Sequence, residues 1–570
     1  MSAFWRAATR PTMRSKIAAH VHPIRWLSVS PCAQLKQVPD SAWLASSDDP
    51  QSDAPADVVL RGTDEVRFGR KYIGMVVPPQ YIGDSIEKRI ADVSRHSMRH
   101  DYLRLADALR STAQITPHGK GKGQQARRQR REDRERLEST PSSRMLAEAV
   151  ESAPRPLPGE RVHEVVPGKR PAPESLVRPG VRLKPHVVEY GPGEAATYLA
   201  AYAPGAYGAI FNVFSELHNR LPDFQPTSML DFGTGPGTAL WAAQDVWMDS
   251  IERFVGIDSS EAMINCAEQI LDELPKNKRP ASTELLRYLA PEQPNTHADL
   301  VVSAFALSEL PSDALRKTTV ETLWQNTKDT LVLIDRGTPN ASRIISEARD
   351  LLLGLSSQAS GDSPTVEIGE LRVPTAVHTV APFPNELGDP SNETPVWMHF
   401  SQRVQRPTFT MRTKHSLSNI EDVHYSYVVM RRGPRPAYPQ VMPSAKVDLD
   451  KARAHPDLYL PSGSPRKPLE QLVSEAFHWP RIIAPPIKRK GHVVADVCTP
   501  DGQIQRWTFT KTHDKQAYRD ARKASWGDLF PHQPKATALR SYVKPLEALS
   551  PEAKQKLNRK QRRSMMEFDE

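Results

Sequence analysis

Cysteine and long hydrophobic runs are scarce in this chain, and acidic residues are missing from its first 39 positions. Only 3 of the 570 residues are Cys, which excludes a disulfide-bonded scaffold and is typical of a reducing compartment. No apolar run approaches the length of a membrane span, so we expect no membrane partner. The mean hydropathy of -0.54 and the 52 Pro residues indicate two or three domains joined by linkers or surface extensions.

The acid-free N-terminus has the composition of a mitochondrial transit peptide. Its basic residues are spread among Ala, Ser, Trp and Ile, and include Arg6, Arg10, Arg14, Lys16 and Arg25. The stretch RWLS at residues 25–28 resembles a matrix-protease cleavage context, so we assign residues 1–30 to the transit peptide and the protein to the mitochondrial matrix. The alternative is a disordered basic terminus without a targeting role.

An apolar run that stops at a carboxylate and opens into glycines organises the rest of the chain. It reads LDFGTGPGTA at residues 230–239, and it predicts a strand over 228–232 and a helix over 239–246. Because Gly233, Gly235 and Gly237 lack a Cβ atom, the backbone there can take positive φ and let a ligand lie against its amides.

The order D-x-G-x-G-x-G places an acid inside the motif, unlike the G-x-G-x-x-G spacing of dinucleotide folds. It is the pattern of S-adenosylmethionine-dependent methyltransferases. Asp258 ends the next apolar segment, where a carboxylate can accept both ribose hydroxyls. Motif, second strand and second acid together favour a cofactor fold over an ordinary glycine-rich loop. The predicted cofactor-binding residues are Asp231, Gly233, Gly235, Gly237, Asp258 and Ala304.

The segments that follow alternate between buried strands and helices. Residues 299–305 and 330–335 predict strands, 260–271 (capped by Ser260) and 341–353 predict helices, and 423–431 alternates like a half-exposed late strand. Apolar runs separated by helix-length segments indicate a parallel sheet covered on both faces. We therefore predict an α/β fold with a Rossmann-like class I methyltransferase sheet over residues 185–433.

Flanking segments of different composition surround this core. Before the core we expect a helical N-terminal segment over residues 57–113 and a basic, Pro-rich linker over 114–184. After the core we expect a second linker over 434–465, a module over 466–530 with a β-hairpin around TPDG at 499–502, and a basic tail over 531–570. The net charge of +9 and the basic blocks suit RNA phosphates, although solvated basic segments are the alternative. Aromatic residues in the predicted helix over 190–207 either cover the cofactor mouth or pack half-buried.

Several stretches resemble one family, the methyltransferase-like proteins of the mitochondrial small ribosomal subunit. The resemblance covers residues 185–529 and rests on LDFGTGPGTA at 230–239, SAFALSELP at 303–311, DRGTP at 335–339, WMHFSQRVQRP at 397–407 and KRKGH at 488–492. It implies a protein that associates with small-subunit rRNA and ribosomal proteins, not DNA, and supports subunit assembly and hence translation. An active mitochondrial rRNA methyltransferase, or one acting on a small molecule, is the alternative.

The resemblance also implies an iron–sulfur cluster, which members of this family commonly hold on four cysteines. The corresponding positions here are Phe383, Asp389 and Met398, and only Cys498 keeps its place. One thiolate cannot hold a cluster that takes four. We therefore expect the cluster to be lost and Phe383 and Met398 to pack against the C-terminal hairpin instead.

The residue types near the predicted site leave catalysis open. A methyltransferase that acts on a base carbon needs a nucleophilic cysteine, but Cys32 lies beside the transit peptide and Cys266 within a predicted helix. One that acts on an exocyclic amine carries Asn/Asp-Pro-Pro-aromatic after the fourth strand, where this chain has AFAL at 304–307. Glu309 is either a general base or a carboxylate at a helix start.

Overall fold

The computed structural model contains an α/β core, a helical segment that precedes it in the sequence and a β-containing module that follows it. The described residues are 62–112, 190–289, 296–358, 365–368, 371–391, 396–438, 451, 454–455 and 466–539. The predictions for the transit peptide, for the linker over 114–184, for most of the linker over 434–465 and for the tail beyond residue 539 lie outside the described residues.

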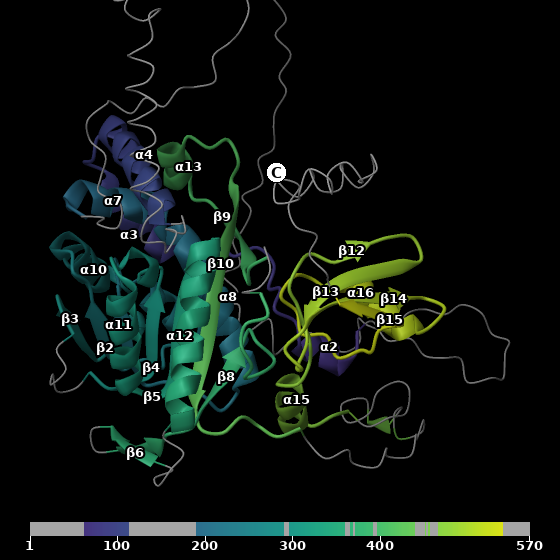
Figure 1. Ribbon diagram of the computed structural model, residues 1–570. Coiled ribbons are helices and arrows are strands. Elements are labelled where there is room, and N and C mark those ends of the chain that lie inside the picture. Colours follow the sequence, from purple (N-terminus) through teal and green to yellow (C-terminus); the bar gives the residue numbers. More distant parts are fainter. Residues whose placement is uncertain are drawn as a thin grey trace, which may run out of the picture. The chain divides into compact units, whose positions relative to one another are not determined.

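The core is built on an eight-stranded sheet in the order β3-β2-β1-β4-β5-β10-β8, with β9 paired to β10 (Figure 1). Strands β1 to β5 pair in parallel, whereas β10 runs antiparallel to β5, β8 and β9. The bounds are Ser228–Phe232 (β1), Arg253–Ile257 (β2), Ser282–Leu286 (β3), Ala298–Ala304 (β4), Thr327–Arg336 (β5), Val377–Ala381 (β8), Phe400–Gln405 (β9) and Ile420–Arg432 (β10). The predicted α/β sheet is confirmed.

Helices cover both faces of this sheet. They are α7 (Pro192–Ala201), α8 (Ala203–Arg220), α9 (Thr238–Val246), α10 (Glu261–Glu273), α11 (Asp313–Gln325), α12 (Pro339–Gln358) and α13 (Thr408–Lys414), with 3₁₀ turns η2 (Lys276–Lys278) and η3 (Leu307–Glu309). Because strand side chains alternate, Met229 and Leu300 pack with α8 and α9, whereas Leu230 and Val301 pack with α11 and α12. The predicted cap is confirmed, since Ser260 Oγ accepts from Met263 N at 3.2 Å.

Strand β10 differs from the predicted half-exposed pattern. Its first part, Ile420 to His424, is exposed or half-buried as expected, but Tyr425 to Met430 are all buried. The reason is position: this part lies between β5 and β8, with α8 and α12 also in contact with it. Tyr425, Ser426 and Tyr427 carry hydroxyls, so the sequence looks like that of a half-exposed strand. The Tyr427 hydroxyl is nevertheless buried and donates to Glu216 Oε2 at 2.6 Å.

The N-terminal segment is helical, as predicted, and it packs on the core. It forms α2 (Asp64–Phe68), α3 (Gln80–Ile90) and α4 (Arg95–Thr112). Ile82 and Ile86 of α3 belong to the main apolar cluster of the core. The extended stretch between α2 and α3 runs beside β9, where Val76 N donates to Arg403 O at 2.9 Å.

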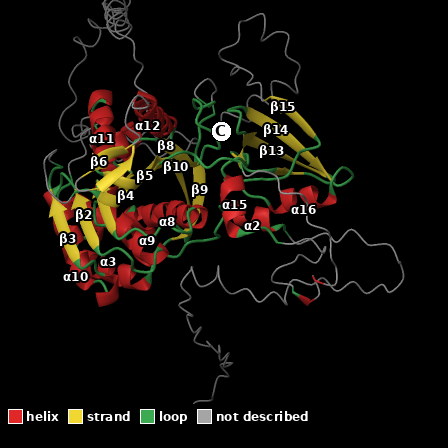
Figure 2. Ribbon diagram, turned by 90° about the horizontal axis from the view of Figure 1, so that it is seen from below, coloured by secondary structure: helices red, strands yellow, loops and turns green. Residues whose placement is uncertain are grey.

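The C-terminal module has a five-stranded sheet in the order β11-β13-β14-β15, with β12 paired to β13 (Figure 2). Its elements are α15 (Leu469–Ala476), β11 (Arg481–Ile482), β12 (Ile487–Lys488), β13 (His492–Cys498), β14 (Ile504–Thr510), α16 (Lys515–Lys523) and β15 (Ala536–Leu539). The predicted hairpin is β13–β14, and β15 lies within the segment expected as a tail. A separate two-stranded sheet pairs β6 (Thr365–Ile368) with β7 (Leu371–Pro374).

Three chain segments meet at one buried carboxylate. Glu216 of α8 pairs with Lys71 from the N-terminal segment at 2.7 Å and with Arg481 from the C-terminal module at 2.6 Å. Burial raises the pKa of Glu216, but the charges of Arg481 and Lys71 outweigh it and hold that pKa well below its usual range. Removing Glu216 would leave two buried cations without a counter-charge, so this carboxylate joins both segments to the core. Among the described helices, none is long and apolar enough to cross a membrane.

Candidate functional site

The glycine turn has the backbone that its sequence predicts. Gly233, Gly235 and Gly237 have φ of 75°, 53° and 92°, values that favour glycine. The amides of Gly233 and Thr234 both donate to Ile257 O, at 2.8 and 2.9 Å, which ties the turn to the end of β2. A Cβ atom on Gly233 would clash with Ala306, so the turn approaches the loop after β4 closely.

The two predicted acids lie on this turn in different states. Asp258 accepts hydrogen bonds from the amides of Gly235 and Ser260, both at 2.9 Å. Asp231 is 1% exposed, and neither of its carboxylate oxygens has a hydrogen-bond partner within the described part of the chain. Burial, with a smaller contribution from the charge of Asp258, raises the pKa of Asp231 to about 7 although Thr234 opposes the shift. A buried carboxylate without a partner is costly unless a ligand completes it.

A cavity at the carboxyl end of β1 and β4 brings together three of the six predicted site residues, Asp231, Gly233 and Ala304. Its lining residues come from α7, α8, the glycine turn and the loop after β4: Tyr198, Ala206, Ile210, Asp231, Gly233, Thr234, Thr238, Ala239, Ala304 and Phe305. The hydroxyls of Thr234 and Thr238 are also buried without a partner. The cavity volume is about 10 Å³, room for about one water molecule. The other three predicted residues, Gly235, Gly237 and Asp258, are not among the lining residues.

The donor set of this cavity fits the amino-acid end of S-adenosylmethionine, but its volume does not. Asp231 offers free acceptors for an ammonium group, whereas the amides of Gly233, Thr234, Gly235 and Gly237 already donate to acceptors of the protein. Tyr198 and Phe305 are the largest side chains on the cavity wall. Phe305 has φ of 63°, which is rare for a bulky residue and marks local backbone strain. Accommodating a cofactor requires these two rings to separate.

Glu309 is neither a free base nor a helix-start carboxylate. It lies in η3 and forms an ion pair with Arg336 at 2.6 Å, and it also accepts from the Tyr190 hydroxyl at 3.3 Å. Burial raises the pKa of Glu309, although Arg336 acts against that shift. Its carboxylate is therefore held by an arginine, not directed at a substrate. The predicted helix over 190–207 divides at Tyr202. Tyr190, Tyr198 and Tyr202 are half-buried, as one of the two expectations had it, and Tyr207 is buried.

Phe383, Met398 and Cys498, three of the positions at which the resemblance implies cluster ligands, are buried among apolar side chains. Phe383, Met398 and Cys498 are 2%, 5% and 0% exposed and belong to one apolar cluster with Ile504 of β14. The predicted packing of Phe383 and Met398 with the hairpin is confirmed. The guanidinium of Arg349 lies 4.5 Å from the centre of the Phe383 ring, a cation–π geometry. Burial raises the pKa of the Cys498 thiol to about 12, and the nearby Asp389 charge adds to the shift.

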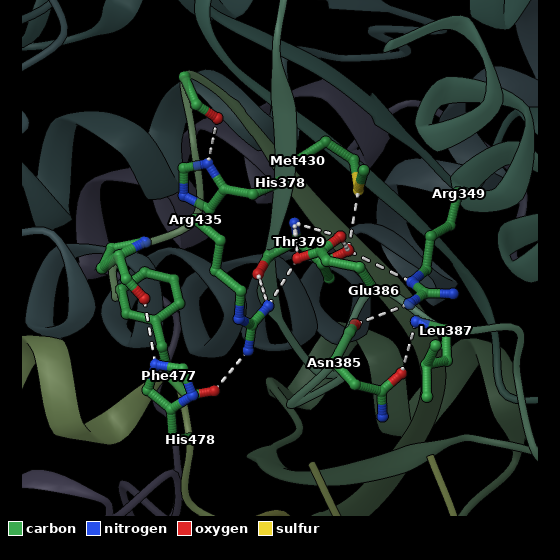
Figure 3. A network of polar contacts seen from close by, with 12 residues as sticks. Arg349, His378, Thr379, Asn385, Glu386, Leu387, Met430, Arg435, Phe477 and His478 are labelled. Carbon is green, nitrogen blue, oxygen red and sulfur yellow. Dashed lines mark hydrogen bonds and ion pairs between the residues drawn. The ribbon is translucent and has the colours of Figure 1, made fainter. Parts of the chain in front are cut away.

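A polar network surrounds this contact (Figure 3). Arg349 donates to Asn385 O at 2.7 Å, and the Asn385 amide donates to Thr499 O at 3.1 Å. Glu386 pairs with Arg435 at 2.6 Å, and Arg435 also donates to Phe477 O of the C-terminal module. Across the described ranges, no group of three or more His, Cys, Asp or Glu side chains could hold a metal ion.

Comparisons with known proteins identify the family of this chain. The family model "Mitochondrial small ribosomal subunit Rsm22" matches residues 192–531, more than half of the chain. The chain belongs to the Rsm22 family. The sheet order, with β10 antiparallel at its place beside β5, is thus the class I methyltransferase fold that the sequence predicted.

Two proteins similar to this chain are named mitochondrial ribosome assembly proteins. The human "Ribosome assembly protein METTL17, mitochondrial" is 32% identical over 346 residues, covering 60% of this chain and 64% of that protein. The Saccharomyces cerevisiae "Ribosome assembly protein RSM22, mitochondrial" is 22% identical over 454 residues, covering 63% of this chain and 69% of that protein. The chain therefore spans somewhat under two thirds of the human relative's length.

Solved structures of methyltransferases resemble the chain only weakly. A putative RNA methyltransferase from Pyrococcus horikoshii is 10% identical with a TM-score of 0.23, covering 39% of this chain and 81% of that chain. The N-methyltransferase NodS from Bradyrhizobium japonicum, solved with S-adenosylhomocysteine, is 13% identical with a TM-score of 0.23, covering 39% and 86%. Likeness at this level carries no argument about activity.

Sequence reasoning missed the polar partners that come from distant segments. Lys71 and Arg481 meet Glu216 across separations of 145 and 265 positions. Arg336 was visible only as part of a motif, without its role as the partner of Glu309. Thr238 could have been found, because it follows the last glycine of the turn and begins α9.

Proposed function

We propose that this protein supports assembly of the mitochondrial small ribosomal subunit in the matrix, and hence mitochondrial translation. The observation that carries the proposal is the match of the Rsm22 family model to residues 192–531. The names of the human and yeast relatives as mitochondrial ribosome assembly proteins support it. The partners are small-subunit rRNA and ribosomal proteins, and the net charge of +9 suits the rRNA.

The glycine turn is proposed as a site for S-adenosylmethionine. The residues that would hold it are Asp231, Gly233, Gly235, Gly237, Asp258 and Ala304. Support comes from the unpartnered carboxylate of Asp231, the positive φ of the glycines and the place of Ala304 on the cavity wall. When bound, the cofactor carries an activated methyl group. Asp231 would accept from its ammonium end, and Asp258 lies at the end of β2 where a ribose would bind.

The assembly role is proposed not to require methyl transfer or an iron–sulfur cluster. Glu309 is held by Arg336, and the loop after β4 offers Ala304, Phe305 and Ala306 where an amine-directed enzyme has polar groups. For the cluster, apolar Phe383 and Met398 occupy two of the four family positions, and they are buried in the core. Neither side chain supplies the thiolate that a cluster requires.

Sucrose-gradient sedimentation of tagged protein from mitochondrial lysate tests the proposal. Wild type is compared with Asp231→Ala and with Asp272→Ala, which removes an exposed carboxylate from α10 and serves as the matched control. We expect all three to sediment with the small subunit and to sustain translation. Absence of the wild type from small-subunit fractions contradicts the proposal. Loss of a specific rRNA methyl group with Asp231→Ala alone instead establishes an active rRNA methyltransferase.

A further inference from the structure

One face of α16 is basic from end to end. Lys515, Arg519, Arg522 and Lys523 are all exposed, and their spacing of four, seven and eight places them on one side of a helix. The opposite side packs on β13 and β14 through buried alanines at 517, 521 and 524. The helix is thus attached to the module by its small residues, and its cations are exposed. Figure 2 shows α16 beside the sheet of the module.

The turn between β12 and β13 extends this basic face. Lys488, Arg489 and Lys490 are exposed there. Arg522 Nη1 donates to Arg489 O at 3.3 Å, so the end of α16 lies against the turn. The pKa of Lys488 is lowered by partial burial and by the charge of Arg522, which shows that cations of the two elements are close enough to repel. Helix and turn form one surface, which we name the α16 basic surface.

Of the two acids of α16 and its cap, Asp514 alone is exposed, against four exposed cations of the helix. Asp520 is 1% exposed on the packed side, where it bonds His532 at 2.8 Å. Asp514 is the helix cap, and its side chain accepts from Ala517 N at 2.9 Å. Clustered cations that repel one another cost free energy in the isolated protein, and a polyanion that binds across them removes that cost.

We propose that the α16 basic surface binds the phosphate backbone of RNA. The inference rests on the proposed function, in which the partner is rRNA, and it assigns the contact to residues 488–490 and 515–523. RNA fits better than an anionic membrane because α16 contributes no exposed large apolar side chain among the described residues, and Ile487, next to Lys488, is a single exposed one rather than an apolar face. A helix that lies in a membrane interface needs an apolar face.

Binding of a fluorescein-labelled 20-nucleotide uridine RNA to the full chain, measured by anisotropy over a salt series, tests the assignment. The variant replaces Lys515, Arg519, Arg522 and Lys523 with Ala, which favours helix and so preserves α16. Because each released counterion contributes about 0.7 to the slope of log affinity against log salt for single strands, four lost contacts should lower the slope by about 3. At low salt we expect the affinity to fall at least about tenfold.

A control variant removes the same charge elsewhere, by replacing Lys88, Arg110, Lys317 and Arg372 with Ala; these side chains are 71%, 74%, 62% and 76% exposed. It should bind the RNA with nearly the wild-type slope. Equal losses in both variants overturn the assignment, because net charge alone would explain them. The assignment is also overturned if the wild type binds cardiolipin-containing vesicles and the uridine RNA does not displace it from them. Wild-type sedimentation with the small subunit reports separately on the proposed function, which can stand when the assignment fails.

Discussion

The glycine turn and the loop over residues 381–391 follow strands of the same sheet, but they differ in whether their buried polar groups have hydrogen-bond partners. At the turn, a buried carboxylate and two hydroxyls, those of Asp231, Thr234 and Thr238, lack partners. In the loop, Phe383 is packed in the apolar core and the Asn385 amide is satisfied by Thr499 O at 3.1 Å. Unsatisfied buried polar groups cost free energy, so the first region fits the ligand that we propose for it, whereas the polar groups of the second are satisfied by their own neighbours.

This difference makes opposite predictions for substitutions. At the loop, the native side chains are the optimum, and truncation should destabilise the fold. At the turn, a native side chain opposes folding, and its neutralisation should stabilise the protein without cofactor. Residues at functional sites often lower the stability of the folded protein because they are suited to function and not to folding.

The largest expected effect is at Phe383. Phe383→Ala should lower the free energy of unfolding by about 3–5 kcal/mol, because it leaves a cavity in the core and removes the ring beneath Arg349. Phe383→Leu is the matched control, since it keeps most of the apolar volume and should cost less than half as much. Urea denaturation followed by tryptophan fluorescence measures both. Equal costs for the two variants would mean that the ring does not fill a packed site.

Replacing Asp231 should raise the free energy of unfolding, whereas replacing Phe383 should lower it. The pKa of Asp231 is about 7 in the folded protein against an ordinary value of 3.8, so the folded state holds the proton more tightly than the unfolded state. That contribution to stability is complete below about pH 4 and is lost as the pH rises to about 7. Above pH 7, Asp231→Asn should therefore exceed wild type in stability, by up to about 4 kcal/mol at roughly 1.4 kcal/mol for each pKa unit.

Denaturation of wild type and Asp231→Asn at pH 5 and pH 8 measures this effect, and the difference between them should grow with pH. Asp272→Asn on the surface of α10 should follow wild type at both values. A difference that stays constant with pH would show that Asp231 is already ionised at little cost, through a partner that satisfies it.

A smaller effect is expected at Phe305, which narrows the cavity at the turn. Phe305→Ala should raise the affinity for S-adenosylhomocysteine about tenfold, or about 1.4 kcal/mol, because the cofactor no longer has to displace the ring. Isothermal titration calorimetry measures it, and Phe305→Tyr, which keeps the ring, is the control. Unchanged affinity in Phe305→Ala would place the bound cofactor away from this cavity.

The sequence predicted the elements of the core because local signals agree with the fold there. Leu230, Val301 and Leu333 lie in apolar runs of strand length, and the turn after β1 has glycine at each position with positive φ. Strand β10 was misjudged because burial from both sides depends on which strands flank it. That information lies in β5 and β8, not in residues 420–432 themselves.

The candidate site was predictable in its residue types but not in its volume. Asp231, Gly233 and Asp258 follow from the motif. Aromatic residues of the helix over 190–207 were expected either at the cofactor mouth or in half-buried packing, and the sequence did not decide that Tyr198 lines the cavity. The same applies to the Arg336 partner of Glu309, because ion pairs between distant segments leave no periodic signal. Sequence patterns report on neighbours along the chain, and cavities depend on neighbours in space.

The smallest effect is expected at Cys498, the family cluster position that keeps its residue. If the loop is an apolar contact, Cys498→Ala should cost only about 1 kcal/mol, as for a small buried hydrophobic side chain. Anaerobically purified wild type and variant should both lack stoichiometric iron and sulfide, and iodoacetamide should not modify Cys498 in the folded protein, since burial raises the pKa of its thiol to about 12. Bound iron that disappears with Cys498→Ala would show that the loop also holds a ligand, and the contrast with the glycine turn would be lost.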